Sequence, residues 1–115
     1  MSIGEFARSS RLSPKALRLY DELGLLAPAR VDDSSGYRFY DAAQLERARL
    51  VAALRQLEMP LAEIKAVLAL DEPAVAAAAV AEYWAGVEAE HSARRRLAGY
   101  LVDLIGGKRS VMYEV

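Results

Sequence analysis

The stretch that decides the fold reads LSPKALRLYDELGLLAP at residues 12–28 and GYRFY at residues 36–40. Ser13 is a typical helix N-cap, and Pro14 suits the first helical turn because the N–H that it lacks has no partner there. Gly24 can adopt the left-handed conformation that commonly ends a helix. These signals predict a short helix over residues 14–23, whose buried face is formed by apolar residues at helical spacing: Leu17, Tyr20 and Leu23.

A small β-hairpin is predicted directly after this helix. Its polar turn, DDSSG, ends in Gly36, which can take the positive φ that a tight turn requires. A hairpin this small needs a helix to pack against. We expect Val31 and Phe39 to face inward, while Tyr37 and Arg38 point outward and make the tip an exposed aromatic and basic wing.

Three more helices are expected around this unit. Ser2 and Glu5 have the spacing of a capping box, which predicts a first helix over residues 3–8. An Asp41 cap predicts a helix to about residue 57, and another follows over residues 61–70. Two short helices followed by a wing are typical of a winged helix-turn-helix, in which the second helix enters the major groove of DNA.

Residues 3–57 resemble the DNA-binding domain of the MerR family of bacterial transcription regulators. The shared motifs are IGEFA, LSPKALRLYDELGLL, GYRFYD and LERARL, in that order. The resemblance implies a mainly α fold, with a winged helix-turn-helix domain at residues 1–71 and a long C-terminal coiled-coil helix. One departure is Leu19, where many relatives carry a second aromatic residue or a histidine. A leucine offers a base only apolar surface, such as contact with a thymine methyl group.

Six residues are predicted to contact double-stranded DNA. Arg18 lies one turn beyond the N-cap, and a guanidinium can bind either phosphate or guanine. Tyr20 combines the spacing of a core residue with a hydroxyl that can reach a phosphate, and Tyr40 is an equal candidate for core or contact. The predicted DNA-binding residues are Ser13, Lys15, Arg18, Tyr20, Tyr37 and Arg38.

A long dimerisation helix is predicted for residues 72–105. No proline interrupts the helix after Pro73, and at 1.5 Å per residue it is about 50 Å long. Apolar residues recur at alternating spacings of three and four, the pattern of a coiled-coil seam, and Glu90 and Arg94 interrupt it with charge. The predicted dimerisation residues are Val80, Tyr83, Val87, Arg94, Leu97, Leu101 and Leu104. Spacing indicates a partner helix, and the resemblance implies antiparallel pairing with a second subunit.

The charge of the chain is low for a protein that binds nucleic acid. The net charge is −1 and the pI is about 5.8. Residues 1–40 carry six basic and five acidic residues, so their net charge is only +1. Phosphate binding therefore has to come from the placement of individual cations, with a dimer doubling the contacts.

Composition argues against several other classes of protein. The chain has no cysteine and a single histidine, His91, so neither a thiolate metal site nor a histidine ligand set is expected, and no cofactor is implied. No nucleophile–base pair or pair of carboxylates suggests catalysis. The N-terminus lacks the pattern of a signal peptide, and no apolar run approaches the roughly 18 residues of a membrane span. These features predict a cytoplasmic protein without a membrane partner.

Residues 106–115 are expected to form a linker or the start of a further domain. Gly106 and Gly107 end the long helix, and SVMYEV then alternates like a strand. The segment resembles the junction at which some multidrug-sensing MerR relatives enter a GyrI-like effector-binding domain. A small-molecule effector is expected only through such a missing domain.

The resemblance implies a homodimer that binds a pseudo-palindromic promoter and activates or represses transcription by RNA polymerase through distortion of the spacer DNA. The alternative is a helical protein-interaction module, whose long helix docks a partner protein while the winged domain does not bind DNA.

Overall fold

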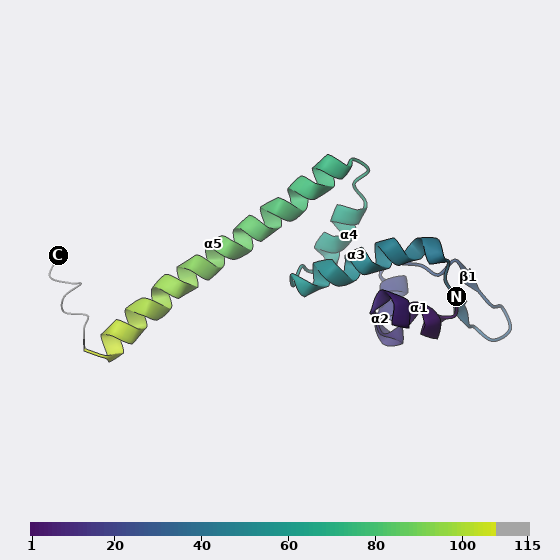
Figure 1. Ribbon diagram of the computed structural model, residues 1–115, viewed down its shortest axis with the longest axis horizontal. Coiled ribbons are helices and arrows are strands. Elements are labelled where there is room, and N and C mark those ends of the chain that lie inside the picture. Colours follow the sequence, from purple (N-terminus) through teal and green to yellow (C-terminus); the bar gives the residue numbers. More distant parts are fainter. Residues whose placement is uncertain (108–115) are drawn as a thin grey trace. The chain divides into compact units, whose positions relative to one another are not determined.

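The computed structural model describes residues 1–107, which fall into two units, Met1–Asp71 and the segment that begins at Glu72. Up to residue 107, the second unit contains one helix, α5 (Pro73–Ile105). The first unit contains α1 (Ile3–Ser10), α2 (Pro14–Glu22), β1 (Arg30–Val31), β2 (Arg38–Phe39), the 3-10 helix η1 (Ala42–Gln44), α3 (Leu45–Gln56) and α4 (Leu61–Leu68). In Figure 1, α1 and α2 lie along one side of α3, and both α1 and α4 contact α3. The mainly α winged helix-turn-helix fold is confirmed.

The helix-turn-helix is built by the caps that the sequence predicts. The Ser13 Oγ accepts the Ala16 N–H at 3.0 Å, and the Ser2 Oγ accepts the Glu5 N–H at 3.2 Å. The Glu5 carboxylate in turn accepts the Ser2 N–H at 3.0 Å, and this backbone hydrogen bond is the main reason that the pKa of Glu5 is lowered. The α1 helix ends at Ser10, one half-turn later than predicted, before Arg11 in the left-handed region at φ 66°.

The expected burial of Leu23 is wrong, since its side chain is 39% exposed. Gly24 takes the predicted positive φ of 73° and redirects the chain. The N–H groups of Leu25 and Leu26 then both donate to the Tyr20 carbonyl, at 2.8 and 3.1 Å. This turn brings those two leucines into the core in place of Leu23.

The core of the first unit lies between α1, α2, α3, α4 and Tyr40, the residue that follows β2. The Phe6 and Tyr40 rings are stacked, with centroids 4.4 Å apart and an interplanar angle of 16°. Leu17, Val51 and Ile64 are also fully buried. The alternative in which Tyr40 is a core residue is the correct one.

The wing is a two-stranded antiparallel hairpin in which Arg30 pairs with Phe39 and Val31 with Arg38. Paired residues lie on the same face of a sheet, so Val31 and Phe39 face opposite sides. The expectation that both face inward is therefore wrong, and Val31 is 48% exposed. In the turn, Gly36 has the predicted positive φ, at 74°.

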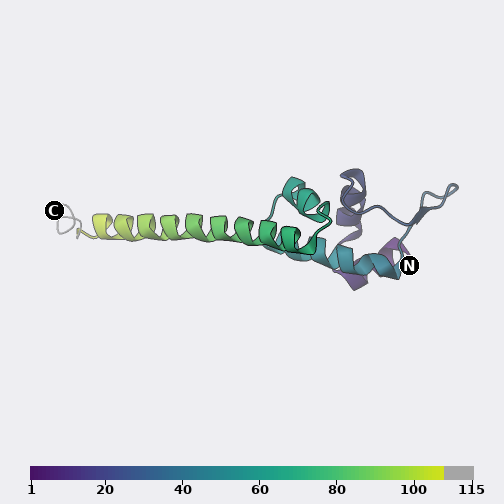
Figure 2. The same ribbon diagram turned by 90° about the horizontal axis from the view of Figure 1, so that it is seen from above.

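The remaining helix boundaries differ slightly from those predicted. Asp41 precedes η1, and α3 starts only at Leu45; the Asp41 N–H donates to the Gln44 Oε1 at 2.9 Å. The α4 helix ends at Leu68. The α5 helix is unbroken in both views (Figures 1 and 2) and starts at Pro73, one residue after the predicted start. It has no fully buried residue. The strand-like tail and the start of a further domain, predicted within residues 106–115, fall largely outside the described residues, which end at residue 107.

Candidate nucleic-acid interface

The outward face of α2 is polar and basic. Lys15 and Arg18 are exposed, while Leu17 on the opposite side is fully buried. Leu19 is 42% exposed and presents apolar surface beside the two cations. This face contains an open hollow of about 470 Å³, which is lined by Ser13, Lys15, Ala16, Arg18, Leu19 and Glu22. The two cations can bind phosphates or base edges, and the leucine can contact a thymine methyl group.

Two of the predicted contacts on α2 are also parts of its internal structure. The Ser13 hydroxyl oxygen caps the helix, which leaves its O–H free to donate to a second group. Tyr20 is 6% exposed, so its ring belongs to the core. The structure therefore brings Ser13, Lys15 and Arg18 together on one surface and leaves Tyr20 almost entirely beneath it.

An ion pair ties the wing to α2. The Arg38 Nε donates to the Asp21 Oδ2 at 3.3 Å, and both side chains are 28% exposed. Only the Nε of the guanidinium takes part, so its two terminal nitrogens remain available for a bidentate contact with a phosphate. Tyr37, the neighbouring wing residue, is 68% exposed. The sequence indicated Arg38 but not Asp21 as a site residue, because the pair joins residues 17 positions apart that meet only in the folded domain.

The Tyr40 hydroxyl is influenced electrostatically by Asp21, Arg38 and Arg18. It is buried and has no hydrogen-bond partner among the described residues. Burial, and secondarily the Asp21 carboxylate, raises the pKa of Tyr40, while Arg38 and Arg18 oppose this effect. The hydroxyl therefore stays protonated at neutral pH. Sequence patterns gave no sign that this core residue reaches the charged surface.

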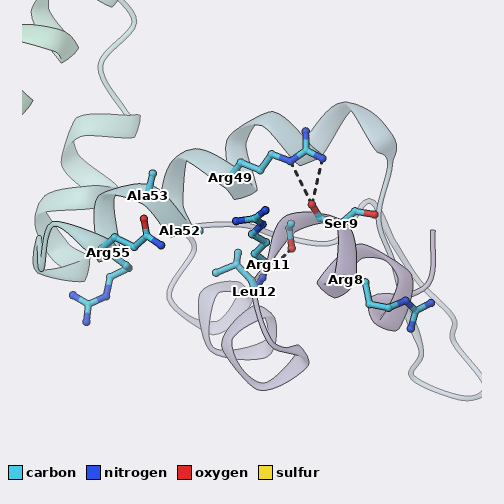
Figure 3. Close-up of a pocket in the computed structure, with 10 residues that line it drawn as sticks. Arg8, Ser9, Arg11, Leu12, Arg49, Ala52, Ala53 and Arg55 are labelled. Carbon is cyan, nitrogen blue, oxygen red and sulfur yellow. Dashed lines mark hydrogen bonds between the residues drawn. The ribbon is translucent and has the colours of Figure 1, made fainter.

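A second hollow, the arginine hollow, lies between α1, the turn that follows it and α3 (Figure 3). It measures about 760 Å³ and is lined by Arg8, Ser9, Ser10, Arg11, Leu12, Arg49, Ala52, Ala53, Arg55 and Gln56. No carboxylate is among these residues. The Arg49 Nε and Nη2 both donate to the Ser9 carbonyl at 3.3 Å, and the Arg55 Nη1 donates to the Met59 carbonyl at 2.7 Å. Two of its four guanidiniums therefore bind backbone carbonyls, one in the last turn of α1 and one in the segment between α3 and α4.

Another wing cation has a structural contact as well. The Arg30 guanidinium carbon lies 4.3 Å from the centroid of the Phe39 ring, a cation–π geometry between paired residues of the two strands. Neither Arg30 nor the arginine hollow was predicted as a functional feature. The sequence carried no signal for either feature. The position of Arg30 opposite Phe39 depends on the hairpin register, and the hollow depends on the contact of α1 with α3 in the folded domain.

The predicted seam residues lie along α5 with different exposures. Val80, Tyr83, Val87 and Leu104 are partly covered, while Arg94 is exposed and Leu97 and Leu101 are 56% and 41% exposed. Within residues 1–107 no cluster of three potential metal ligands occurs, and no helix of that part of the chain is long and apolar enough to cross a membrane.

Comparisons with known proteins give one consistent result. Residues 1–71 match the family described as MerR HTH family regulatory protein. The transcriptional regulator BrlR of Pseudomonas aeruginosa is 38% identical over 104 residues, which cover 88% of this chain and 38% of BrlR. The multidrug-efflux transporter 1 regulator of Bacillus subtilis is 42% identical over 64 residues, which cover 56% of this chain and 23% of that protein.

Two solved structures are similar in fold as well as in sequence. One is the regulator PbrR691 from Ralstonia metallidurans in complex with lead(II), with 31% identity and a TM-score of 0.70 over 90% of this chain and 84% of that chain. The other is EcmrR, seen in a cryo-EM structure of an EcmrR–DNA complex, with 29% identity and a TM-score of 0.64 over 88% of this chain and 38% of that chain. Since the family match spans well over half of the residues, the chain belongs to the MerR family of helix-turn-helix regulatory proteins.

Proposed function

We propose that this chain is the DNA-binding and dimerisation part of a cytoplasmic transcription regulator that binds a pseudo-palindromic promoter as a homodimer. The observation that carries the proposal is the pairing of Arg38 with Asp21, which fixes a wing cation against the helix that presents Lys15 and Arg18. Three cations are thereby held on adjacent elements of one domain. Such an arrangement suits a nucleic-acid backbone better than scattered surface charges would.

In this mechanism α2 enters the major groove and the wing grips the flanking backbone. Arg18 binds guanine or phosphate, Lys15 and the Ser13 hydroxyl contact phosphates or base edges, and Tyr37 and Arg38 contact the backbone beside the groove. Because few side chains are proposed to contact base edges, direct readout of the DNA sequence is limited. Specificity then depends on the cost of deforming the DNA, as expected for a regulator that bends and untwists a promoter spacer.

A dimer joined through α5 doubles these contacts and presents two α2 helices to successive turns of the duplex. RNA polymerase at the same promoter is the proposed functional partner, and EcmrR supports this, since it is described in a complex with DNA and the open polymerase complex. The chain spans 38% of BrlR and 23% of the efflux regulator. We propose no effector site and no catalytic step for residues 1–107.

One observation favours the competing function of a protein-interaction module without DNA binding. Residues 1–71 carry ten basic and ten acidic residues, so the domain has no net attraction for a polyanion. The DNA proposal depends on local placement, and this makes it testable by removing single cations.

The test begins by selecting, from a random-sequence library, the duplexes that the chain binds. The affinity for these duplexes is then measured by fluorescence anisotropy at a series of salt concentrations. Affinity should fall steeply with salt. Arg18→Ala and Arg38→Ala should each flatten the slope of the logarithm of the binding constant against the logarithm of the salt concentration by about one unit per subunit. Arg95→Ala, which removes an exposed cation of α5, should leave the slope unchanged. Binding that ignores salt, or that survives loss of both Arg18 and Arg38, would instead support the interaction module.

A further inference from the structure

The coiled-coil seam of α5 has two opposite charges at its centre. Glu90 and Arg94 follow Val87 and precede Leu97, and both charged side chains are exposed in the single chain. Their spacing of four residues allows attraction within one helix. Among residues 1–107, however, no ion pair joins Glu90 to Arg94, and the ion pair found there is Arg38–Asp21. Glu90 and Arg94 therefore remain available to a partner helix.

The seam also has the same chemistry when it is followed from either end. Reversing the seam about its centre exchanges each apolar residue with another apolar residue and the acidic residue with the basic one. The exchanged positions are Val80 with Leu104, Tyr83 with Leu101, Val87 with Leu97, and Glu90 with Arg94. In an antiparallel coiled coil of two identical helices, these are the positions that face one another across the two-fold axis.

We propose that Glu90 and Arg94 form a self-recognition element, in which Glu90 of each α5 meets Arg94 of the partner subunit at the centre of an antiparallel dimer. This inference rests on the homodimer of the proposed function and adds its register and the residues that specify it. Two identical ion pairs then flank the two-fold axis, and three apolar layers lie on either side of them. Buried polar groups in a seam are known to specify register and orientation in this way.

Other arrangements leave the charges without suitable partners. In a parallel dimer Glu90 faces Glu90 and Arg94 faces Arg94, so like charges meet at the centre. If the antiparallel pairing slips by one heptad, Glu90 faces Val87 in one direction and Leu101 in the other. A desolvated charge without a partner is strongly unfavourable, so these arrangements are disfavoured relative to the proposed one.

Cysteine cross-linking measures the register directly, because the chain has no cysteine of its own. Val80→Cys mixed with Leu104→Cys should give a cross-linked dimer with a short bifunctional thiol reagent. Either variant alone should not, because like positions would lie about 36 Å apart at 1.5 Å per residue. Cross-linking of Val80→Cys alone would indicate a parallel dimer, and cross-linking of Val80→Cys with Leu97→Cys a slipped one; each result overturns the register.

Charge exchange tests the specificity element itself. Glu90→Arg should raise the dimer dissociation constant at least about a hundredfold, roughly tenfold for each of the two broken pairs, and Arg94→Glu should do the same. The double variant Glu90→Arg/Arg94→Glu restores both pairs and should return the constant to within about tenfold of the original. Matched controls are Glu88→Arg and Arg95→Glu, which make the same charge changes at exposed positions outside the seam and should have little effect.

Circular dichroism and sedimentation equilibrium on the full chain separate the outcomes. If the single variants keep their helix content and the double variant is as weak as the single ones, the self-recognition element is refuted. If the unmodified chain is a dimer but cross-links in another register, this inference fails while the proposed regulator stands. If the unmodified chain is monomeric at micromolar concentration, the proposed homodimer fails as well.

Discussion

The ion pair between Arg38 and Asp21 makes a prediction that separates stability from DNA binding. Removing either side chain breaks the same contact, which joins the Arg38 Nε and the Asp21 Oδ2 at 3.3 Å. Both side chains are 28% exposed, and partly solvated pairs contribute about 0.5–1 kcal/mol after screening. A double-mutant cycle of Asp21→Ala and Arg38→Ala should therefore give a coupling energy of about 0.5–1 kcal/mol in the free energy of unfolding.

The two variants should differ when DNA is added. Arg38→Ala removes the proposed phosphate contact and should flatten the salt dependence of binding by about one unit per subunit, whereas Asp21→Ala leaves the cation in place and should keep the slope. Unfolding is followed by urea titration at one fixed protein concentration, since a dimer's stability depends on concentration.

Asp33→Ala is the matched control, because it removes a neighbouring exposed carboxylate of the wing turn. A coupling energy of zero would mean that the pair does not tie the wing to α2. A slope that changes equally in Asp21→Ala and Arg38→Ala would refute the assignment of the phosphate contact to Arg38.

Three further predictions concern the stability of the winged domain. Glu58 has φ 62° at the end of α3, so Glu58→Gly should raise the free energy of unfolding by about 1 kcal/mol while Glu58→Ala should not, as measured by urea titration. The Tyr40 hydroxyl is buried without a partner in the described residues, so Tyr40→Phe should be neutral or stabilising by about 1 kcal/mol, whereas Tyr40→Ala should cost about 3–5 kcal/mol in the same assay. Hydrogen bonds from Ser35 and then Ser34 lower the pKa of Asp32 from its ordinary value of 3.8. The stability that the ionised Asp32 contributes is therefore complete above pH 3.8 and is lost as the pH falls through the lowered pKa. Asp32→Ala should flatten this part of a plot of melting temperature against pH.

Local signals in the sequence were sufficient for most of the fold. The caps at Ser2 and Ser13, the positive φ of Gly24 and Gly36, and the long α5 all follow from residue chemistry within a few positions. The inward placement of Val31 failed because hairpin register decides which residues share a face, and a two-residue strand gives too short a pattern to reveal that register.

The candidate site was less predictable, because its contacts join distant parts of the chain. Exposed cations at helical spacing identified Lys15 and Arg18, but nothing near Arg38 in the sequence indicated Asp21. The arginine hollow likewise forms only because α1 and α3 contact each other in the fold, where Arg49 binds the Ser9 carbonyl 40 positions away in the sequence. Spacing along one helix can therefore be read from a sequence, whereas partners across the fold require the tertiary structure.

The low net charge has a physical consequence for how such a regulator would bind DNA. A domain with equal numbers of acids and bases gains little from long-range attraction, so its affinity depends on a few short contacts and on making them twice. Dimer strength then contributes directly to DNA affinity, although α5 supplies none of the proposed DNA contacts. Charge reversal at Glu90 should therefore weaken DNA binding while leaving the slope per bound subunit unchanged, because the cations of α2 and the wing stay intact. In this proposal two acidic residues assist DNA binding, because Asp21 holds Arg38 in the wing and Glu90 pairs with Arg94 of the partner subunit in the seam.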